Sequence, residues 1–551
     1  MRHISASTPL EKPVVIPALQ TWTGGSGTFT LPAEPTIATH DAALAAIAAP
    51  DPALTAIAAP DSALTAIAAA DPALAAIANR DAALATRDAA IAVPDPALAA
   101  LGTRDAAIAV PDSALAAMAT RLAADLTRHT GRPARVADAG GADVVLVLDP
   151  SLGDDRGGLR FDREGYRLEV TAQRVVVTAP SVTGLFYGTR SLLQMLVRGA
   201  VPVGTAVDWP NYESRGFMLD VGRRFFTAEA IRGYIEVMGW YKLNEFQLHL
   251  NDNEIKAPDG DWTKAKAAFR LRSDNPEFSG LAAEDGAYDR AEWDSFEDLA
   301  SANGVTIIPE IDAPGHARAF VAFRPELGLD GGNSDHLDLS KPESTDFVRD
   351  VFTEFMPWFR AEEVHYGTDE YFADPELYRG FFNDMAAHVR GLGKRARAWG
   401  SATRMTGTAD GYDRGVTINS WNNGWYGPAE AVRDGYRFIN TNDDLLYIVP
   451  YADYYRGEGL DGRWLYENWE PHVFADGQVV EPGEPLLLGA MSAVWNDLVR
   501  AEYTELDVWR MVEPTFGLLA QKMWAGGGGV AYETFMEHVR EVGSPGQPWR
   551  G

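Results

Sequence analysis

From about residue 210 onward, short apolar runs alternate with longer amphipathic stretches. The runs are rich in β-branched residues and end in polar turns, which is typical of strands, whereas TAEAIRGYIEVMGWYK and STDFVRDVFTEFMPWF show helical spacing. Strands are predicted at 216–221, 244–250, 304–311, 363–367, 395–400, 416–421, 436–441 and 486–495. Eight strands alternating with helices over 210–525 predict an α/β fold with a (β/α)8 TIM barrel. The alternative is a doubly wound open sheet, which the lack of a G-x-G-x-x-G motif after the first strand disfavours in its dinucleotide-binding form.

The preceding part of the chain, 12–205, has the pattern of a small α+β domain. VVLVL, YRLEV and RVVVTA indicate short strands, and LFYGTRSLLQML has helical spacing of its apolar residues. Residues 41–120 interrupt this domain with Ala-rich units such as DPALTAIAAP, which recur about every ten residues. Each unit resembles a short helical turn that is too short to be stable alone. We expect an insertion without catalytic role, the alternative being a spacer or interaction element. Residues 526–551 are expected to form a C-terminal tail.

Composition narrows the classes of partner. The chain has 551 residues and a formal net charge of −30, which argues against nucleic acid and anionic membranes as partners and favours neutral substrates. No run reaches the roughly 18 consecutive apolar residues of a membrane span. The start, MRHISASTPLEKP, lacks the apolar segment of a secretory signal, so we expect a cytoplasmic protein, or a secreted one whose signal was removed. The absence of cysteine excludes disulfides, thiolate zinc sites and a cysteine nucleophile. The oligomeric state is not predicted.

The predicted strands end in chemically active residues. Catalytic groups of a TIM barrel lie at the C-terminal ends of its strands. In this chain those ends carry Asp220, Arg223, His249, Asn251, Asp252, Glu310, Asp312, His316, His365, Asp369, Glu370, Tyr371, Trp399, Trp421, Trp495 and Asp497. Carboxyl groups can protonate a leaving oxygen and stabilise an oxocarbenium-like transition state, and tryptophan faces suit sugar rings. The histidines lack the spacing of a zinc motif, so we expect no metal and no cofactor. The strand ends therefore predict a glycosidase.

The adjacent acidic residues Asp369 and Glu370 are the predicted catalytic centre. Side chains of neighbours in an extended strand diverge, so this pair would not face each other across a glycosidic bond as acid and nucleophile. A nucleophile within the substrate resolves this difficulty. The 2-acetamido oxygen of an N-acetylhexosamine can attack, with Asp369 orienting it and Glu370 handling the proton. Glu310 and His365 are predicted to support these residues.

Five spaced motifs resemble the family 20 glycoside hydrolases, the β-N-acetylhexosaminidases. They are SRGFMLDVGRRFF, KLNEFQLHLNDNE, IIPEIDAPGHARA, VHYGTDEYF and AVWND, in the family's order, and the resemblance runs from about residue 12 to 525 apart from the repeat. It implies a retaining enzyme that removes terminal β-linked GlcNAc or GalNAc from a glycan. It also implies substrate-assisted catalysis through an oxazolinium intermediate, with Glu370 as the general acid/base and Asp369 holding the acetamide.

The resemblance implies further residue roles. Arg215 resembles the arginine that binds sugar hydroxyls, and Asp252 and His316 match the pair that hydrogen-bonds to the acid/base. Trp399, Trp421 and Trp495 resemble the aromatic box around the acetamide. Tyr447 is the best match for the tyrosine that donates to the acetamide oxygen, with Tyr451 and Tyr454 as alternatives.

One departure from the family pattern concerns substrate size. Asp497 stands where many exo-acting members have glutamate, and the LHLNDNE and TDEY forms resemble a bacterial subgroup that also contains lacto-N-biosidases. Those enzymes release a Gal–GlcNAc disaccharide, which is the first alternative function. The second is a non-catalytic carbohydrate-binding protein.

Overall fold

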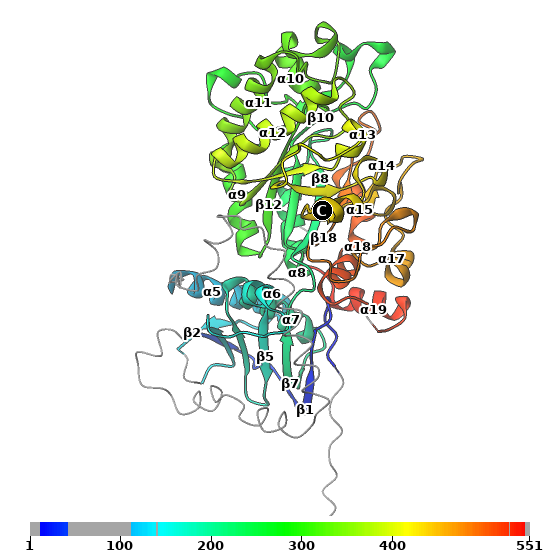
Figure 1. Cartoon of the computed structure of the whole chain (residues 1–551). Coiled ribbons are helices and arrows are strands. Elements are labelled where there is room, and N and C mark those ends of the chain that lie inside the picture. Colours follow the sequence, from blue (N-terminus) through cyan, green and yellow to red (C-terminus); the bar gives the residue numbers. More distant parts are fainter. Residues whose placement is uncertain (1–11, 42–111, 139–140, 528, 546–551) are drawn as a thin grey trace, which may run out of the picture.

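The computed structural model describes residues 12–41, 112–138, 141–527 and 529–545. These residues form a smaller sheet domain and a barrel (Figure 1). None of the helices in the described part is both long and apolar enough to cross a membrane.

The smaller domain is built on one seven-stranded sheet in the order β1-β7-β5-β6-β4-β2-β3. Its strands are β1 (Thr23–Phe29), β2 (Thr36–Asp41), β3 (Arg135–Val136), β4 (Val144–Leu148), β5 (Tyr166–Val170), β6 (Val175–Ala179) and β7 (Val201–Asp208). Its helices are α5 (Asp112–Thr130), α6 (Leu159–Glu164) and α7 (Val182–Leu196). The predicted strands VVLVL, YRLEV and RVVVTA coincide with β4, β5 and β6, and the predicted helix lies within α7. Figure 1 shows the three helices between this sheet and the barrel.

The predicted Ala-rich insertion is too long at its C-terminal end. Most of it, 42–111, lies outside the described residues. Helix α5 begins at Asp112, however, and its side chains Leu115, Met118 and Ala119 are buried in the core of the domain. Their i, i+3, i+4 spacing places them on one helix face, which is what a helix packed on a sheet requires. Residues 112–120 therefore belong to the domain and not to an insertion.

The second unit is a closed barrel of eight parallel strands. The strands are β8 (Ser214–Asp220), β9 (Glu245–His249), β12 (Thr306–Ala313), β13 (Glu363–Gly367), β14 (Arg395–Trp399), β15 (Thr417–Ser420), β16 (Phe438–Asn440) and β18 (Leu487–Val494). Each lies on one of the eight predicted strands. The barrel closes because β18 pairs with β8 on one side and with β16 on the other, both in parallel. Closure confirms the TIM barrel and rules out the open-sheet alternative.

Helices connect the strands around the outside of the barrel. They are α8 (Ala228–Trp240), α9 (Arg290–Ala302), α10 (Arg318–Phe323), α11 (Pro342–Phe355), α12 (Pro375–Gly391), α13 (Ala402–Thr406), α14 (Asn423–Tyr426), α15 (Pro428–Asp434), α16 (Asp443–Leu446), α17 (Gly462–Asn468) and α18 (Glu505–Trp524). Local chemistry sets several starts: capping boxes begin α9 at Asp289 and α18 at Thr504, and Asp374 caps α12 before a proline.

Short elements lie in the connections between strands and helices. Strands β10 (Asn251–Asn253) and β11 (Ala267–Phe269) form a hairpin-like pair after β9, and β17 (Tyr447–Ile448) pairs with β18. The 3₁₀ helices are η1 (Pro258–Gly260), η2 (Trp262–Lys264), η3 (Pro276–Phe278), η4 (Pro325–Leu327), η5 (Leu329–Gly332), η6 (Met356–Trp358) and η7 (Ala475–Gly477).

The predicted C-terminal tail contains a packed helix, α19 (Tyr532–Val542). Its apolar side chains Phe535 and Val542 are buried in the main core. The carbonyl of Gly543, which follows the helix, accepts hydrogen bonds from the side chains of Trp240 and Tyr241, at 2.8 Å each. The prediction of a simple tail is therefore wrong over 532–543, because the amphipathic pattern there covers an apolar surface of the barrel.

The smaller domain packs against the N-terminal end of the barrel. The guanidinium group of Arg121 donates to the carbonyl of Ala302 and to the side chain of Asn303, just after α9. Tyr187 in α7 donates its hydroxyl to the carbonyl of Gly304 at 2.8 Å. These contacts lie before the start of β12, so this end of the barrel is covered and the C-terminal end of the strands is left for a site.

Candidate active site

Asp369 and Glu370 lie in the turn after β13 and not in an extended strand. The strand ends at Gly367, and Thr368 and Glu370 both have left-handed backbone, with φ of 78° and 46°. Gly367 also has positive φ, and a Cβ there would lie 1.6 Å from Oδ1 of Asp312, so only glycine fits. The premise that the pair follows extended geometry is therefore wrong. Left-handed backbone at two non-glycine residues is strained and is typical of functional sites.

His316 connects both acidic side chains. Its Nε2 lies 3.4 Å from Oε2 of Glu370 and 3.6 Å from Oδ2 of Asp369, and its Nδ1 lies 2.9 Å from Oδ1 of Asp252. Burial lowers the pKa of His316, but the charges of Asp252 and Asp369 and the hydrogen bonds to Asp252 and Glu370 raise it well above its ordinary value overall. The structure thus brings together the carboxylate–His–Glu chain that the sequence predicts, with His316 as a cation.

The pKa of Glu370 is controlled by this histidine. Burial raises the pKa of Glu370, but the hydrogen bond and charge of His316 and the charge of Arg223 outweigh burial and lower it overall. Its side chain is 44% exposed, which makes it the accessible member of the pair. Without a bound sugar, Glu370 is therefore a carboxylate that faces solvent.

Asp369 is buried and lies beside a second carboxyl group, that of Asp312. One oxygen of each lies within 4.8 Å of the other, and within the described part Oδ1 of Asp369 and Oδ2 of Asp312 find no conventional donor. Burial, followed by the charge of Asp369, raises the pKa of Asp312 well above its ordinary value. Burial and the neighbouring charge thus favour the neutral form of Asp312, which can donate a hydrogen bond that lowers the pKa of Asp369.

Several groups shift the pKa of Asp369 itself. Burial raises the pKa of Asp369, the charge of His316 opposes this, the charges of Glu370 and Glu310 add to it, and the hydrogen bond from Asp312 opposes it. The pKa of Asp369 is raised overall, in contrast to that of Glu370. The two neighbours therefore differ in burial, in partners and in the direction of their pKa shifts.

The arginine at this site is Arg223, and the predicted Arg215 lies elsewhere. Arg215 is near the N-terminal end of β8, fully buried, with its guanidinium 2.7 Å from Oε1 of Glu164 in the smaller domain. Arg223 follows the C-terminal end of the same strand. Its Nη1 lies 2.8 Å from Asp252, 3.1 Å from Asp220 and 3.4 Å from Asp497. The prediction for Arg215 is corrected because a residue at the start of a strand and a residue after its end lie at opposite ends of the barrel.

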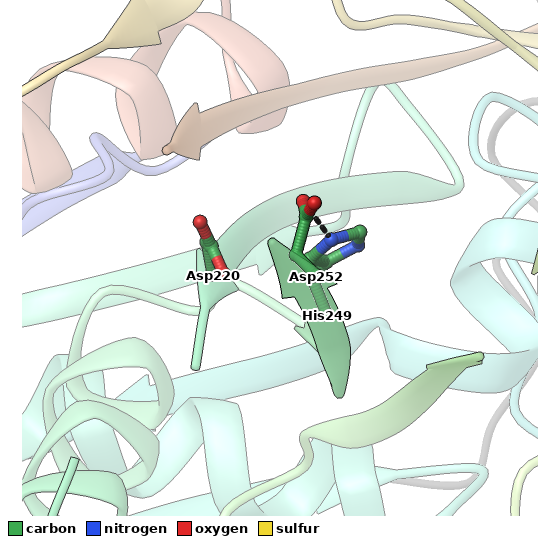
Figure 2. A group of neighbouring side chains, drawn as sticks. All are labelled: Asp220, His249 and Asp252. Atoms are coloured by element: carbon green, nitrogen blue, oxygen red, sulfur yellow. Dashed lines mark hydrogen bonds and ion pairs between the residues drawn. The ribbon is translucent and has the colours of Figure 1, made fainter. Parts of the chain in front are cut away.

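Asp220, His249 and Asp252 form a buried cluster where β8 and β9 end (Figure 2). Nε2 of His249 lies 2.7 Å from Oδ2 of Asp252, as the dashed line in Figure 2 marks, and Asp220 lies to one side of this pair. Spacing of this kind suits a metal ion, but the guanidinium of Arg223 contacts both aspartates. The side chain of Arg223 therefore supplies the positive charge that this cluster requires.

A second buried layer is centred on Glu310. Its carboxylate accepts from Nε1 of Trp399 at 2.6 Å and from the side-chain amide of Gln247 at 2.7 Å, and it lies 3.0 Å from Nδ1 of His249. Burial raises the pKa of Glu310, but the charges of His249 and His365 and these hydrogen bonds lower it to about 2 overall. Glu310 and His365, predicted to be supporting residues, lie within this layer, and Glu310 fixes the orientation of Trp399.

The predicted aromatic residues lie in one cluster with Met218, Ile439 and Met491. The rings of Trp399 and Tyr447 each lie 5.7 Å from the ring of Trp495, and Nε1 of Trp421 donates to the carbonyl of Gly400. All four predicted members, Trp399, Trp421, Trp495 and Tyr447, are buried. The structure therefore gathers them from four different parts of the chain into one aromatic wall.

The three candidate tyrosines have different surroundings. Tyr447 is buried, and burial, followed by the charges of Asp443, Tyr455 and Asp369, raises its pKa. Tyr454 instead donates its hydroxyl to Oδ2 of Asp497 at 3.0 Å, and Tyr451 is largely exposed. The charge of Asp369 therefore acts on the hydroxyl group of Tyr447.

The sequence analysis names Arg223 and Asp312 among the strand-end residues without giving either a specific role, and it does not name Gln247. Arg223 and Asp312 had a usable signal, since both follow or end a barrel strand on its C-terminal side. Gln247 lies inside β9, where only the side chain's direction into the barrel gives it a function. That direction is not readable from a short apolar run.

Two family models match the chain. "Glycosyl hydrolase family 20, catalytic domain" matches residues 212–375, and "Glycosyl hydrolase family 20, domain 2" matches residues 93–209. Together they cover more than half of the chain.

Curated relatives and solved structures agree with this match. The chain is 28% identical to a lacto-N-biosidase of Bifidobacterium bifidum over 436 residues, which is 73% of this chain but 36% of that protein. It is 29% identical to a β-N-acetylhexosaminidase of Cellulomonas fimi over 434 residues, covering 73% of this chain and 82% of that enzyme. A mutant Streptomyces plicatus β-hexosaminidase in complex with its product GlcNAc has the same fold, with a TM-score of 0.69 at 20% identity, covering 97% of this chain and 96% of the other.

Proposed function

Because the chain belongs to glycoside hydrolase family 20, we propose that it removes terminal β-linked N-acetylhexosamine from glycans by substrate-assisted catalysis. The observation that carries this proposal is the unequal pair Asp369 and Glu370, joined by one histidine. A buried carboxylate with a free oxygen and an accessible carboxyl group suit two different tasks.

In the first step, the substrate's own acetamide acts as the nucleophile. Oδ1 of Asp369 accepts a hydrogen bond from the acetamide N–H, which makes the acetamide oxygen more nucleophilic and aims it at the anomeric carbon. A bond forms between that oxygen and the carbon as the bond to the leaving oxygen breaks, and Glu370 gives its proton to the leaving oxygen. The charge of Asp369 stabilises the oxazolinium ion that results.

In the second step, Glu370 removes a proton from a water molecule that attacks the same carbon. The oxazolinium ring opens, and the configuration at the anomeric carbon is retained because it has been inverted twice. The low pKa of Glu370 in the ligand-free site suits this base role. Its acid role needs a bound sugar, which displaces water and deepens the burial of the carboxyl group, and burial raises its pKa.

The aromatic wall and Arg223 bind the sugar. Trp399, Trp421 and Trp495 present apolar surface suited to an acetamide methyl group, and Tyr447 supplies a hydroxyl donor near Asp369. Arg223 and Asp497 provide charged hydrogen-bonding groups for sugar hydroxyls at the edge of the site.

A panel of glycosides tests this proposal. We expect the enzyme to release the chromophore from an aryl β-N-acetylglucosaminide or β-N-acetylgalactosaminide, and to leave the aryl β-glucoside, which lacks the acetamide, almost untouched. Efficient cleavage of the plain glucoside would remove substrate assistance from the mechanism. Cleavage of no glycoside in the panel would favour a non-catalytic carbohydrate-binding protein.

A second candidate function is release of a Gal–GlcNAc disaccharide. Asp497 favours it, because aspartate is one methylene shorter than glutamate and its carboxylate is drawn toward Arg223 and Tyr454. One matching relative is a lacto-N-biosidase, although the match spans only 36% of that protein. Release from the aryl Galβ1-3GlcNAc glycoside without release from the aryl β-N-acetylglucosaminide would establish this function in place of the first.

A further inference from the structure

An aromatic rim lies outside the aromatic wall and has no part in the chemistry described above. It consists of Trp425 in the short helix α14 and of Phe372 and His336, which come from two different loops. The ring of Trp425 lies 5.5 Å from that of Trp421 in the wall, and the ring of Phe372 lies 5.8 Å from that of Trp425 in an edge-on contact. Phe372 also lies 5.9 Å from the ring of His336. A continuous row of rings therefore runs from the acetamide wall to the surface.

Phe372 is unusually open for its type. The residue is 65% exposed, which makes it the most exposed aromatic residue among those that the structure describes. A single exposed apolar residue is ordinary on a protein surface. Phe372 differs because its ring contacts those of Trp425 and His336, which support its position while most of the residue stays open to solvent.

The rim is attached to the backbone of the proposed acid. Phe372 follows Glu370 by two residues, and Nε2 of His336 lies 2.9 Å from the carbonyl oxygen of Glu370. Nδ1 of His336 in turn lies 2.6 Å from Oδ1 of Asp335, which fixes the ring. Because Glu370 protonates the oxygen between the released sugar and the leaving group, the leaving group lies on the side of Glu370. Through Phe372 and His336, the rim adjoins Glu370.

We propose that the aromatic rim binds the first sugar ring of the leaving glycan, with the apolar C–H face of that pyranose packed on Phe372. This assignment rests on the proposed function. Aromatic rings bind sugars through such faces, and the exposed guanidinium of Arg404, 5.8 Å from the ring of Trp425, supplies donors for the hydroxyls at the edge of the same sugar. The enzyme should therefore cleave a substrate with an oligosaccharide leaving group more efficiently than one with a small alkyl leaving group.

The test compares two leaving groups in the same enzyme. The wild type and the variants Phe372→Ala, Phe372→Tyr and Trp464→Ala are assayed on methyl β-N-acetylglucosaminide and on the GlcNAc-terminated disaccharide that the wild type cleaves fastest. Both substrates are also prepared with a β1-3 galactose on the N-acetylglucosamine, so that the test applies whether the enzyme releases N-acetylglucosamine or the Gal–GlcNAc disaccharide. Trp464 is the matched control, since it is an exposed aromatic residue on α17, away from the rim.

Phe372→Ala is expected to lower kcat/KM on the disaccharide by about tenfold, mainly through KM, and to leave the methyl glycoside within about twofold of wild type. Phe372→Tyr keeps the ring and is expected to match the wild type on both, as is Trp464→Ala. Equal losses on both substrates, or no loss on the disaccharide, would overturn the rim assignment while the proposed function stands. A wild type that cleaves none of the substrates overturns the proposed function, and the rim assignment with it.

Discussion

The two ends of the barrel both contain buried arginines among carboxylates, but only one end is left open. At the N-terminal end, Arg215 pairs with Glu164, Arg397 pairs with Glu245 and Glu363, and Arg395 also pairs with Glu363. At the C-terminal end, the single guanidinium of Arg223 contacts Asp220, Asp252 and Asp497. The first end balances its charges within the protein, and the second gathers more carboxylates than nearby cations.

This difference follows from what covers each end. Glu164 belongs to the smaller domain, which packs on the N-terminal end and completes the ion pair of Arg215. A buried charge is costly unless it is paired, so this end is complete without a ligand. At the other end, carboxyl oxygens of Asp312 and Asp369 lack conventional donors, and His316 and Glu370 have left-handed backbone. Unsatisfied atoms and backbone strain mark the end that awaits a substrate.

The largest expected effect is loss of the acid at the open end. Glu370→Gln keeps the shape of the side chain but cannot transfer a proton, so we expect kcat/KM to fall by about two orders of magnitude or more on substrates with poor leaving groups. An activated aryl leaving group needs less protonation and should lose less. Steady-state rates on both kinds of substrate check this. Rates near those of wild type on the poor leaving group would exclude Glu370 as the acid.

A matched pair of arginine variants tests the comparison directly. Arg223→Lys keeps the charge but loses the planar fork and its hydrogen bonds, and should lower kcat/KM by about tenfold to a hundredfold as well as reduce the free energy of unfolding. Arg215→Lys loses hydrogen bonds to Glu164 and to backbone carbonyls, and should reduce the free energy of unfolding by about 1–3 kcal/mol with kcat/KM unchanged. Denaturant titration and kinetics on both variants separate the two effects. A fall in kcat/KM for Arg215→Lys with none for Arg223→Lys would show that Arg215 is the sugar-binding residue after all.

The Asp312–Asp369 pair predicts a shift in the pH profile. Asp369 works as a carboxylate, so activity is lost as the pH falls through its pKa. Asp312→Leu removes the hydrogen bond that holds this pKa down, so the acid limb of kcat/KM should move to higher pH. Asp312→Asn keeps a neutral donor and should leave the acid limb in place, provided that its amide points at Asp369. Identical acid limbs in the Leu and Asn variants would argue against a protonated Asp312.

The smallest effect is expected from the Ala-rich segment, which connects β2 and α5 of the smaller domain in the sequence. β2 ends at Asp41 and α5 begins at Asp112, and connections between a strand and the next helix are ordinarily short. Replacement of 42–111 by a short Gly–Ser linker should leave kcat/KM within about twofold of wild type, because loop length alters stability only weakly. Activity and thermal unfolding of the shortened chain check this. Failure to fold would assign the segment a structural role.

Most of the fold could be predicted from the sequence, because its strands and helices have strong local patterns. All eight barrel strands were located, since each is a short apolar run bounded by turn residues. The two errors of extent, at residues 112–120 and 532–543, share one cause. In the first, the prediction followed from composition, and in the second from position after the barrel, although the apolar spacing of the helix-forming residues already indicated packing in both.

By itself, the sequence determined the barrel, the acidic pair and the aromatic and histidine residues at the strand ends. It did so because strand direction alone places the C-terminal ends on one face. Only the tertiary structure decided which arginine joins the site, that Asp312 lies against Asp369, and that Phe372 stands beside Glu370 with its ring exposed. These features depend on contacts between residues far apart in the chain and on backbone turns with positive φ, and neither leaves a periodic signal in the sequence.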